Sequence, residues 1–254
     1  MDQLTTYEKV RPDRMPQMAD GVFSRAFEDA GAYYAAAALE QQATYRRYQP
    51  VGGAWSLSYD TSMLRIGEVS VHQSPLGSLG YDGSWLWAWG NERTHPPGVP
   101  RLSLAVWLRE FGERNGIYEF VEPRLELAAF ADPVGAAERL ATVALGALRT
   151  RGFASCPLDN GARAFVIVDD AAVPEAGFNR RVVSGMFDVA VRQFPYDPRQ
   201  TATGYLARHG FTVRQAVADG SLHAERHDGT TVAVRFTEEG FLATVSVGGP
   251  PSAG

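Results

Sequence analysis

The chain has 254 residues, of which 45% are hydrophobic and 21% are charged, and its formal net charge is −5. This composition is that of an ordinary globular protein, and the length suffices for one large domain or two smaller ones. The negative charge, without any long basic run, argues against nucleic acid or an anionic membrane surface as a main partner. No stretch approaches the ~20 apolar residues that a membrane-spanning helix needs.

The number of cysteines and the N-terminal residues indicate the cellular compartment. Cys156 is the single cysteine, which excludes an internal disulfide framework and a cysteine-based metal cluster. A reducing cytoplasm is therefore the expected setting. Residues 1–7 lack the basic and apolar regions of a signal peptide, so none is expected.

The first fifth of the chain predicts an arm followed by a helix. Residues 1–20 carry prolines and scattered charges, which is typical of a loose N-terminal arm. Apolar spacing and a run of alanines predict a helix over residues 21–49, and Pro50 with the glycines after it ends that helix. Antiparallel strands are then predicted over residues 54–60 and 63–73.

The next predicted strand, residues 84–91, holds three of the five tryptophans. Because side chains alternate along a strand, Trp85, Trp87 and Trp89 project from one face. The glycines of residues 74–80 mark a bulge or a close backbone approach beside this stripe. Tryptophan buries a large apolar area but carries a donor that needs a partner. The stripe therefore fills a core or walls a ligand pocket, and the sequence leaves both open.

Helices and strands alternate in the second half. The pattern predicts helices over residues 102–115, 132–151, 178–193 and 197–210, and extended segments over residues 117–127 and 163–169. Four strands at residues 211–217, 221–227, 231–236 and 241–247, joined by acidic-glycine turns, predict a meander. The fold class is therefore α+β, with antiparallel sheets and helices packed on one face. We expect an arm (1–20) and two sheet-bearing halves (21–152 and 153–249), or one continuous domain.

Candidate site residues cluster around the tryptophan stripe. If the stripe walls a pocket, Gln73, Ser78 and Asn91 are its polar contacts, and His72 and Tyr81 are placed to orient or protonate a ligand. A further acid–base candidate, Asp169, follows an apolar strand, although acidic pairs at strand ends commonly belong to turns. Cys156 is either a nucleophile or a small buried hydrophobic residue.

One histidine-containing strand is a weak metal candidate. Alternation places His223, Glu225 and His227 on one face, and two imidazoles with a carboxylate can bind zinc or iron. The two histidines lie about 13 Å apart along an extended strand, so a single ion would reach only neighbouring members. A solvent-exposed strand face is the favoured explanation of this loosely defined pattern. We expect no metal and no other cofactor, since nucleotide-binding and serine-hydrolase motifs are absent.

The segments Leu76-Gly77-Ser78-Leu79 and Trp85-Leu86-Trp87-Ala88-Trp89-Gly90-Asn91 resemble a bacterial family of uncharacterised domains. The helix around residues 108–113 fits the same pattern, and so does the tail from Asp197, so that the resemblance spans most of residues 25–245. Gly90 departs from the alanine of that pattern. The resemblance implies a shared fold, and it assigns no activity and no catalytic residue.

Two classes of function remain from the sequence. In the first, the tryptophan stripe walls a pocket that binds or transforms a small apolar or aromatic metabolite by cofactor-free acid–base chemistry. In the second, the protein is a non-enzymatic, immunity-type or partner-binding protein, and the tryptophans are structural core. Neither the oligomeric state nor the identity of a ligand follows from the sequence.

Overall fold

A computed structural model describes residues 21–50, 54–215 and 220–249. The predicted arm at residues 1–20 lies outside these ranges, as do residues 51–53 after the first helix and Asp219 of the first meander turn. The architecture is α+β with two antiparallel sheets, as predicted. None of the helices in the described ranges combines the length and the apolar character that crossing a membrane requires.

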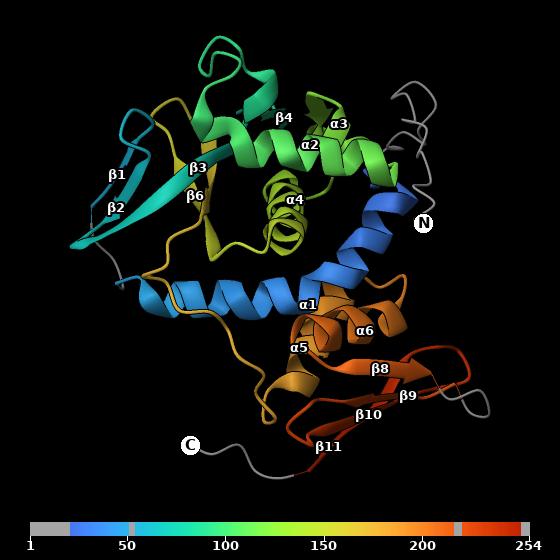
Figure 1. The fold of residues 1–254 in the computed structure, drawn as a ribbon. Coiled ribbons are helices and arrows are strands. Elements are labelled where there is room, and N and C mark those ends of the chain that lie inside the picture. The colour runs from blue at the N-terminus through green and yellow to red at the C-terminus, as the bar shows by residue number, and fades with distance from the viewer. Residues whose placement is uncertain (1–20, 51–53, 216–219, 250–254) are drawn as a thin grey trace, which may run out of the picture. The chain divides into compact units, whose positions relative to one another are not determined.

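The chain folds into two compact units, and each is discontinuous in sequence. Unit 1 consists of the described residues up to Glu28 and of the chain from Gln49 to Val173, whereas unit 2 consists of Asp29–Tyr48 and the described residues from Pro174 onward. Helix α1 (Arg25–Tyr48) begins in unit 1 and belongs to unit 2 from Asp29 onward (Figure 1). The division of the chain into halves at residue 152 stays a prediction.

Unit 1 contains a seven-stranded sheet and three α-helices beyond the start of α1. In chain order its elements are β1 (Trp55–Ser58), β2 (Met63–Ile66), β3 (Val69–Leu79), β4 (Ser84–Trp87), 3-10 helices Ala88–Gly90 and Pro100–Leu102, α2 (Ser103–Asn115), α3 (Tyr118–Val121), β5 (Arg124–Glu126), 3-10 helix Leu127–Ala129, α4 (Pro133–Leu148), β6 (Gly152–Pro157) and β7 (Arg163–Val168). Strands β1 to β5 pair in order, and β3 also pairs with β7, which pairs with β6.

Helices α2 and α4 pack against this sheet, and local groups mark the start of α4 and the end of α2. The Asp132 carboxylate accepts a hydrogen bond of 2.9 Å from the Gly135 N–H, which caps the start of α4. Gly116 ends α2 in the left-handed conformation at φ +66°.

Three predicted segments of unit 1 are wrong in detail. The strand expected over residues 63–73 is a hairpin, because Gly67 at φ +56° turns the chain between β2 and β3. The tryptophan strand ends at Trp87, and Ala88–Gly90 form a 3-10 helix. Residues 117–127, expected to be extended throughout, contain the one-turn helix α3 before the short strand β5.

Gly77 explains how the tryptophan strand fits the sheet. It lies at an irregularity in the pairing of β3 with β7, and on the other side it pairs with Trp87 of β4. A Cβ added at this position would lie 2.6 Å from Cζ2 of Trp85 and 2.8 Å from the Leu86 carbonyl oxygen. The glycine therefore leaves the space that the indole occupies, as the glycine pattern predicted.

A buried carboxylate joins the start of α1 to α3 within unit 1. Glu119 is fully buried, and its two oxygens accept hydrogen bonds of 2.5 and 2.7 Å from the N–H and Oγ of Ser24. Ser24 Oγ in turn accepts the Phe27 N–H at 3.2 Å, which caps α1. Burial raises the pKa of the Glu119 carboxyl, and the hydrogen bonds from Ser24 oppose that rise.

Unit 2 is a four-stranded meander with helices on one face (Figure 1). After α1, its elements are α5 (Val183–Gln193), α6 (Pro198–Arg208), β8 (Thr212–Gln215), β9 (Leu222–Glu225), β10 (Thr231–Phe236) and β11 (Leu242–Gly248). Helix α6 contacts β8 and β9, and α5 contacts β11. Asp197 caps α6 by accepting the Gln200 N–H at 3.0 Å. Gly229 and Gly240 adopt positive φ in the turns between the strands, and the predicted meander is confirmed.

Candidate functional site

The first two tryptophans of the stripe lie in the core of unit 1. The side chains of Trp85 and Trp87 are fully buried, and their rings meet edge to face with centroids 5.1 Å apart. Trp85 also contacts Phe165 and Trp87 contacts Phe120, in both cases edge to face. The indole N–H of Trp87 donates a hydrogen bond of 2.8 Å to the Glu119 carbonyl oxygen. Two large aromatic side chains are thus packed and one donor is satisfied.

The third tryptophan departs from the predicted stripe. Trp89 lies on the 3-10 helix after β4 and is half-buried, and the Arg109 guanidinium lies 4.7 Å from its ring centroid. The indole N–H groups of Trp85 and Trp89 are buried and have no acceptor among the described residues. Whether the stripe contacts a ligand stays a prediction.

The three acid–base candidates do not meet at one point. His72 and Asp169 are neighbours, because the Asp169 N–H donates to the His72 carbonyl oxygen at 3.3 Å. The adjacent Asp170 carboxylate accepts the His72 N–H at 2.8 Å, and this bond is the largest cause that lowers the pKa of Asp170. Tyr81 lies beyond the opposite end of β3 and is 84% exposed. His72 is also exposed, so no enclosed acid–base pair forms from these residues.

Two of the three predicted polar contacts, Gln73 and Asn91, hydrogen-bond to the backbone. Gln73 is buried and its Nε2 donates to the Ser58 carbonyl oxygen at 3.2 Å, while its Oε1 has no partner among the described residues. Asn91 Oδ1 accepts the Thr94 N–H at 3.3 Å, as a turn residue does. Ser78 is half-buried on β3. Gln73 therefore links β3 to β1, and Asn91 stabilises its own turn.

Cys156 lies on β6, a strand that the sequence pattern did not predict, and is 5% exposed. Burial raises the pKa of its thiol to about 11. At pH 8 only about one thiol in a thousand is then ionised, and the thiolate is the nucleophile. We expect native protein at pH 8 to react with iodoacetamide far more slowly than the same protein in urea, followed by mass spectrometry. Equal rates in the two conditions would contradict the buried thiol.

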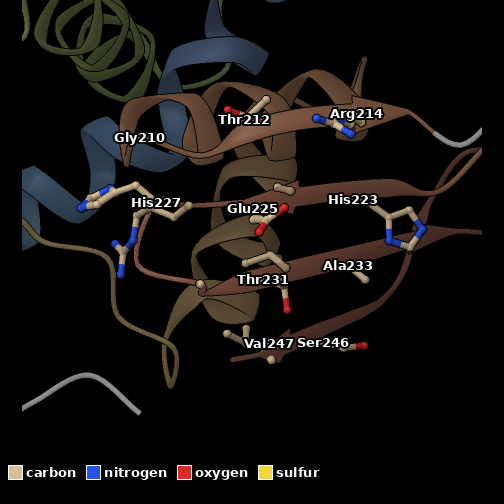
Figure 2. A pocket seen from close by; sticks show the side chains of 15 residues that line it. Gly210, Thr212, Arg214, His223, Glu225, His227, Thr231, Ala233, Ser246 and Val247 are labelled. Carbon is tan, nitrogen blue, oxygen red and sulfur yellow. The ribbon is translucent and has the colours of Figure 1, made fainter. Parts of the chain in front are cut away.

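A pocket lies in unit 2, on the meander face that the helices do not cover (Figure 2). Its volume is about 840 Å³, which falls in the range of small-molecule sites. It is lined by Gly210, Thr212, Arg214, His223, Ala224, Glu225, Arg226, His227, Gly229, Thr231, Val232, Ala233, Ser246, Val247 and Gly248. Hydroxyl-bearing, basic and acidic side chains thus share one surface.

Strand register explains why these side chains face the pocket together. On β9, Leu222 and Ala224 are buried whereas His223 and Glu225 are exposed, so the alternation of these two polar residues is as predicted. Cross-strand pairing places Thr212 and Thr231 beside Glu225. The same pairing places Arg214 beside His223, and Figure 2 shows both on the open face.

Two opposite charges in this pocket have no partner among the described residues. Neither the Arg214 guanidinium nor the Glu225 carboxylate makes a hydrogen bond or ion pair with any described residue. By contrast, Arg226 pairs with Asp228 at 2.6 Å, and hydrogen bonds from this arginine lower the pKa of the Asp228 carboxyl. Within the described ranges, the Arg214 and Glu225 charges are therefore open to a ligand.

The described structure does not bring the three metal candidates of the meander, His223, Glu225 and His227, together as one group. His223 Nε2 lies 2.9 Å from the Ser221 hydroxyl, and His227 lies in the turn after β9 rather than on the strand. Across the described ranges, no group of three or more His, Cys, Asp or Glu side chains is placed to hold a metal ion.

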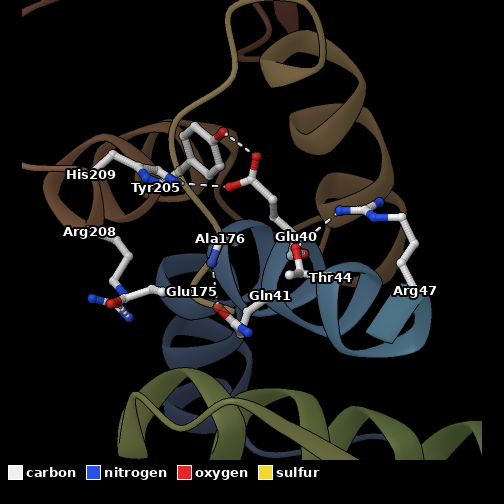
Figure 3. A network of polar contacts seen from close by, with 9 residues as sticks. All are labelled: Glu40, Gln41, Thr44, Arg47, Glu175, Ala176, Tyr205, Arg208 and His209. Atoms are coloured by element: carbon white, nitrogen blue, oxygen red, sulfur yellow. Dashed lines mark hydrogen bonds and ion pairs between the residues drawn. The ribbon is translucent and has the colours of Figure 1, made fainter. Parts of the chain in front are cut away.

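Sequence reasoning missed a buried polar network in unit 2 (Figure 3). The Glu40 carboxylate on α1 accepts the Tyr205 hydroxyl at 3.0 Å, and its second oxygen lies 2.8 Å from His209 Nε2. Burial raises the pKa of the Tyr205 phenol, and the Glu40 charge adds to the rise. The spacing of Tyr205 and His209 puts them on one helix face, but Glu40 is 165 positions from Tyr205 in the sequence.

Further polar contacts next to Glu40 also involve α1 and α6. The Gln41 side chain donates to the Pro174 carbonyl oxygen at 3.0 Å and accepts the Ala176 N–H at 2.8 Å. Arg208 and Glu175 form an ion pair of 2.7 Å (Figure 3). Because every member is engaged with protein groups, this network holds α1 to α6 and to the segment before α5.

Fold and site together define an α+β protein with a buried tryptophan core in unit 1 and an open polar sheet in unit 2. The chain belongs to a family of unknown function (DUF6882), whose model matches residues 28–171, more than half of the chain. This confirms the resemblance to an uncharacterised family. The match ends before the meander, so the pocket lies outside the matched residues. No curated protein and no solved structure matches the chain.

Proposed function

We propose that this chain is a binding protein whose site is the pocket on the meander of unit 2, and that the tryptophan strand serves as structural core. The observation that carries the proposal is a pair of opposite charges, Arg214 and Glu225, that lie in one pocket of about 840 Å³ and have no partner in the part of the chain that the structure describes. The exposed and separated positions of His72 and Tyr81 support binding rather than acid–base catalysis.

The chemistry of the pocket favours a small zwitterion, such as an amino acid or a short peptide. The Arg214 guanidinium matches a carboxylate, which it can bind through two parallel hydrogen bonds. The Glu225 carboxylate matches an ammonium group, and the hydroxyls of Thr212, Thr231 and Ser246 supply further donors and acceptors. A ligand with a single sign of charge would leave one of the two charged groups uncompensated.

Calorimetric titration with a panel of amino acids and dipeptides tests the proposal. We expect Arg214→Gln and Glu225→Gln each to weaken binding about tenfold or more, since each removes one charge-assisted contact. Arg235→Gln is the matched control, because Arg235 is exposed on β10 but does not line the pocket. The proposal fails if no zwitterion binds, or if Arg235→Gln weakens binding as much as Arg214→Gln.

A second candidate function rests on the indole N–H of Trp85, which is buried without an acceptor among the described residues. A small apolar or aromatic metabolite with an acceptor group would satisfy this donor, and the tryptophan stripe would then wall its pocket. All five tryptophans lie between residues 55 and 107, in unit 1, so their emission reports on this region alone. A metabolite titration that shifts the emission of the native chain, but not of Trp85→Phe, supports the pocket. A panel that shifts neither argues against it.

We also propose a cytoplasmic setting without nucleic acid as a partner. The single free thiol of Cys156 supports a reducing compartment. The net charge of −5 supports partners other than nucleic acid.

A further inference from the structure

Strand β11 is an end strand of the meander, and none of its residues is charged. It runs for seven residues, Leu242–Gly248, and pairs on one side with β10. Natural sheets usually guard such edges with charges, prolines, bulges or short strands. The opposite edge strand, β8, is only four residues long and carries Arg214. The pairing of β11 with β10 has one irregularity near the start of β11, where Arg235 pairs with Thr244 and Phe236 with Leu242. From Thr244 to Gly248 the pairing is regular, so this uncharged stretch is the less protected edge of the sheet.

The side chains of β11 are complementary to a second copy of the same strand. Thr244 and Ser246 are exposed, and Val245 and Val247 are half-buried. Consider two copies of β11 paired antiparallel, with Val245 at the centre of the pair. A residue that precedes Val245 in one copy then faces the residue that follows Val245 by the same number of positions in the other copy. Thr244 then faces Ser246 and Val245 faces itself, so hydroxyls meet hydroxyls and apolar groups meet apolar groups.

The ends of the strand reinforce this match. Phe241, just before β11, is 63% exposed. At the other end, the Gly248 and Gly249 carbonyl oxygens accept hydrogen bonds of 2.7 and 3.0 Å from Arg180. Antiparallel pairing brings Phe241 of one copy opposite Gly249 of the other, near this guanidinium. The exposed ring would be covered and would gain a cation–π partner.

We propose that two copies of the chain associate through β11, antiparallel and about a two-fold axis at Val245. The result is one continuous sheet with four strands from each copy, in which the interface uses the same patch on both copies. Because this axis is perpendicular to the sheet, the two open polar faces lie on the same side. The association does not depend on the proposed ligand.

Substitutions that place charges on β11 test the proposal, and light scattering measures the mass of the full chain in solution. We expect the native chain to have about twice the mass of one chain, 27.6 kDa. Thr244→Lys with Ser246→Lys should halve the mass, because lysines then face lysines across the axis. Thr244→Glu with Ser246→Glu should do the same. Mixing the two variants should restore the doubled mass, which also shows that both remain folded.

Two single variants serve as matched controls on the same exposed face. Thr231→Lys adds a charge on β10, one strand inside the edge, and Thr212→Lys adds one on β8, at the opposite edge. Both should keep the doubled mass. The proposal is overturned if the native chain has the mass of one copy at every concentration, if the mixture stays at single mass, or if Thr212→Lys alone halves the mass.

Discussion

Gly204→Ala is expected to lower the free energy of unfolding by about 3 kcal/mol, the upper end of the usual cost of overpacking. Gly204 lies on α6 where this helix meets α1. An added Cβ would overlap the Tyr33 carbonyl oxygen and lie 2.7 Å from its carbon and 3.0 Å from its Cα. These are backbone atoms, which cannot rotate away, so the helices must separate and the Glu40 contacts must lengthen.

Urea unfolding followed by far-ultraviolet circular dichroism measures this cost. Gly185→Ala is the matched control, because Gly185 lies on the neighbouring helix α5 of the same unit and an added Cβ there meets nothing within 4 Å. We expect this control to be neutral or to stabilise by roughly 0.5–1 kcal/mol through backbone entropy. Equal midpoints for the two variants would disprove the close approach of α6 to α1.

Trp87→Ala is expected to cost about 3–5 kcal/mol, as large-to-small changes of buried aromatic residues do. The substitution removes a fully buried ring between Trp85 and Phe120. It also leaves the Glu119 carbonyl oxygen without the hydrogen bond that it now accepts at 2.8 Å. Trp87→Phe keeps most of the apolar burial and loses the donor, so its cost should be smaller, about 1–2 kcal/mol.

Trp107→Ala serves as the control for this loss. Trp107 lies on α2 in the same unit, is 39% exposed and stacks on Phe111 with centroids 5.5 Å apart. Removing it should cost about 0.5–1.5 kcal/mol, the value of an aromatic pair. Tryptophan emission follows the unfolding of unit 1 in both variants. A cost for Trp87→Ala no larger than that for Trp107→Ala would argue against its role as core.

Segments governed by local chemistry were predictable from the sequence. The meander follows from glycines that turn the chain at positive φ about every ten residues, as Gly229 and Gly240 do. The start of α4 follows from one capping side chain, Asp132. In each case the determining group lies within a few positions of the structure it sets, so no distant contact is needed to infer it.

Segments governed by distant contacts were not predictable. Trp89 leaves the strand because Ala88–Gly90 form a 3-10 helix. Gly90 lies close to a distant segment, since an added Cβ would lie 2.7 Å from Cβ of Pro123. Strand β6 lacks an alternating pattern and forms because β7 pairs with it. The partner of Tyr205 and His209 is Glu40, and nothing near either position indicates it. The pocket likewise depends on the register of separate strands.

The passage of α1 from one unit into the other has a consequence for biosynthesis. Residues 29–48 leave the ribosome early, but the helix that covers Glu40, α6, begins only at Pro198. Contacts of such long sequence separation form slowly, because closing the loop costs entropy before any contact repays it. Unit 2 cannot be completed while the first three-quarters of the chain is being synthesised. During this time α1 has no α6 to pack against, and a chaperone would be most useful at this stage.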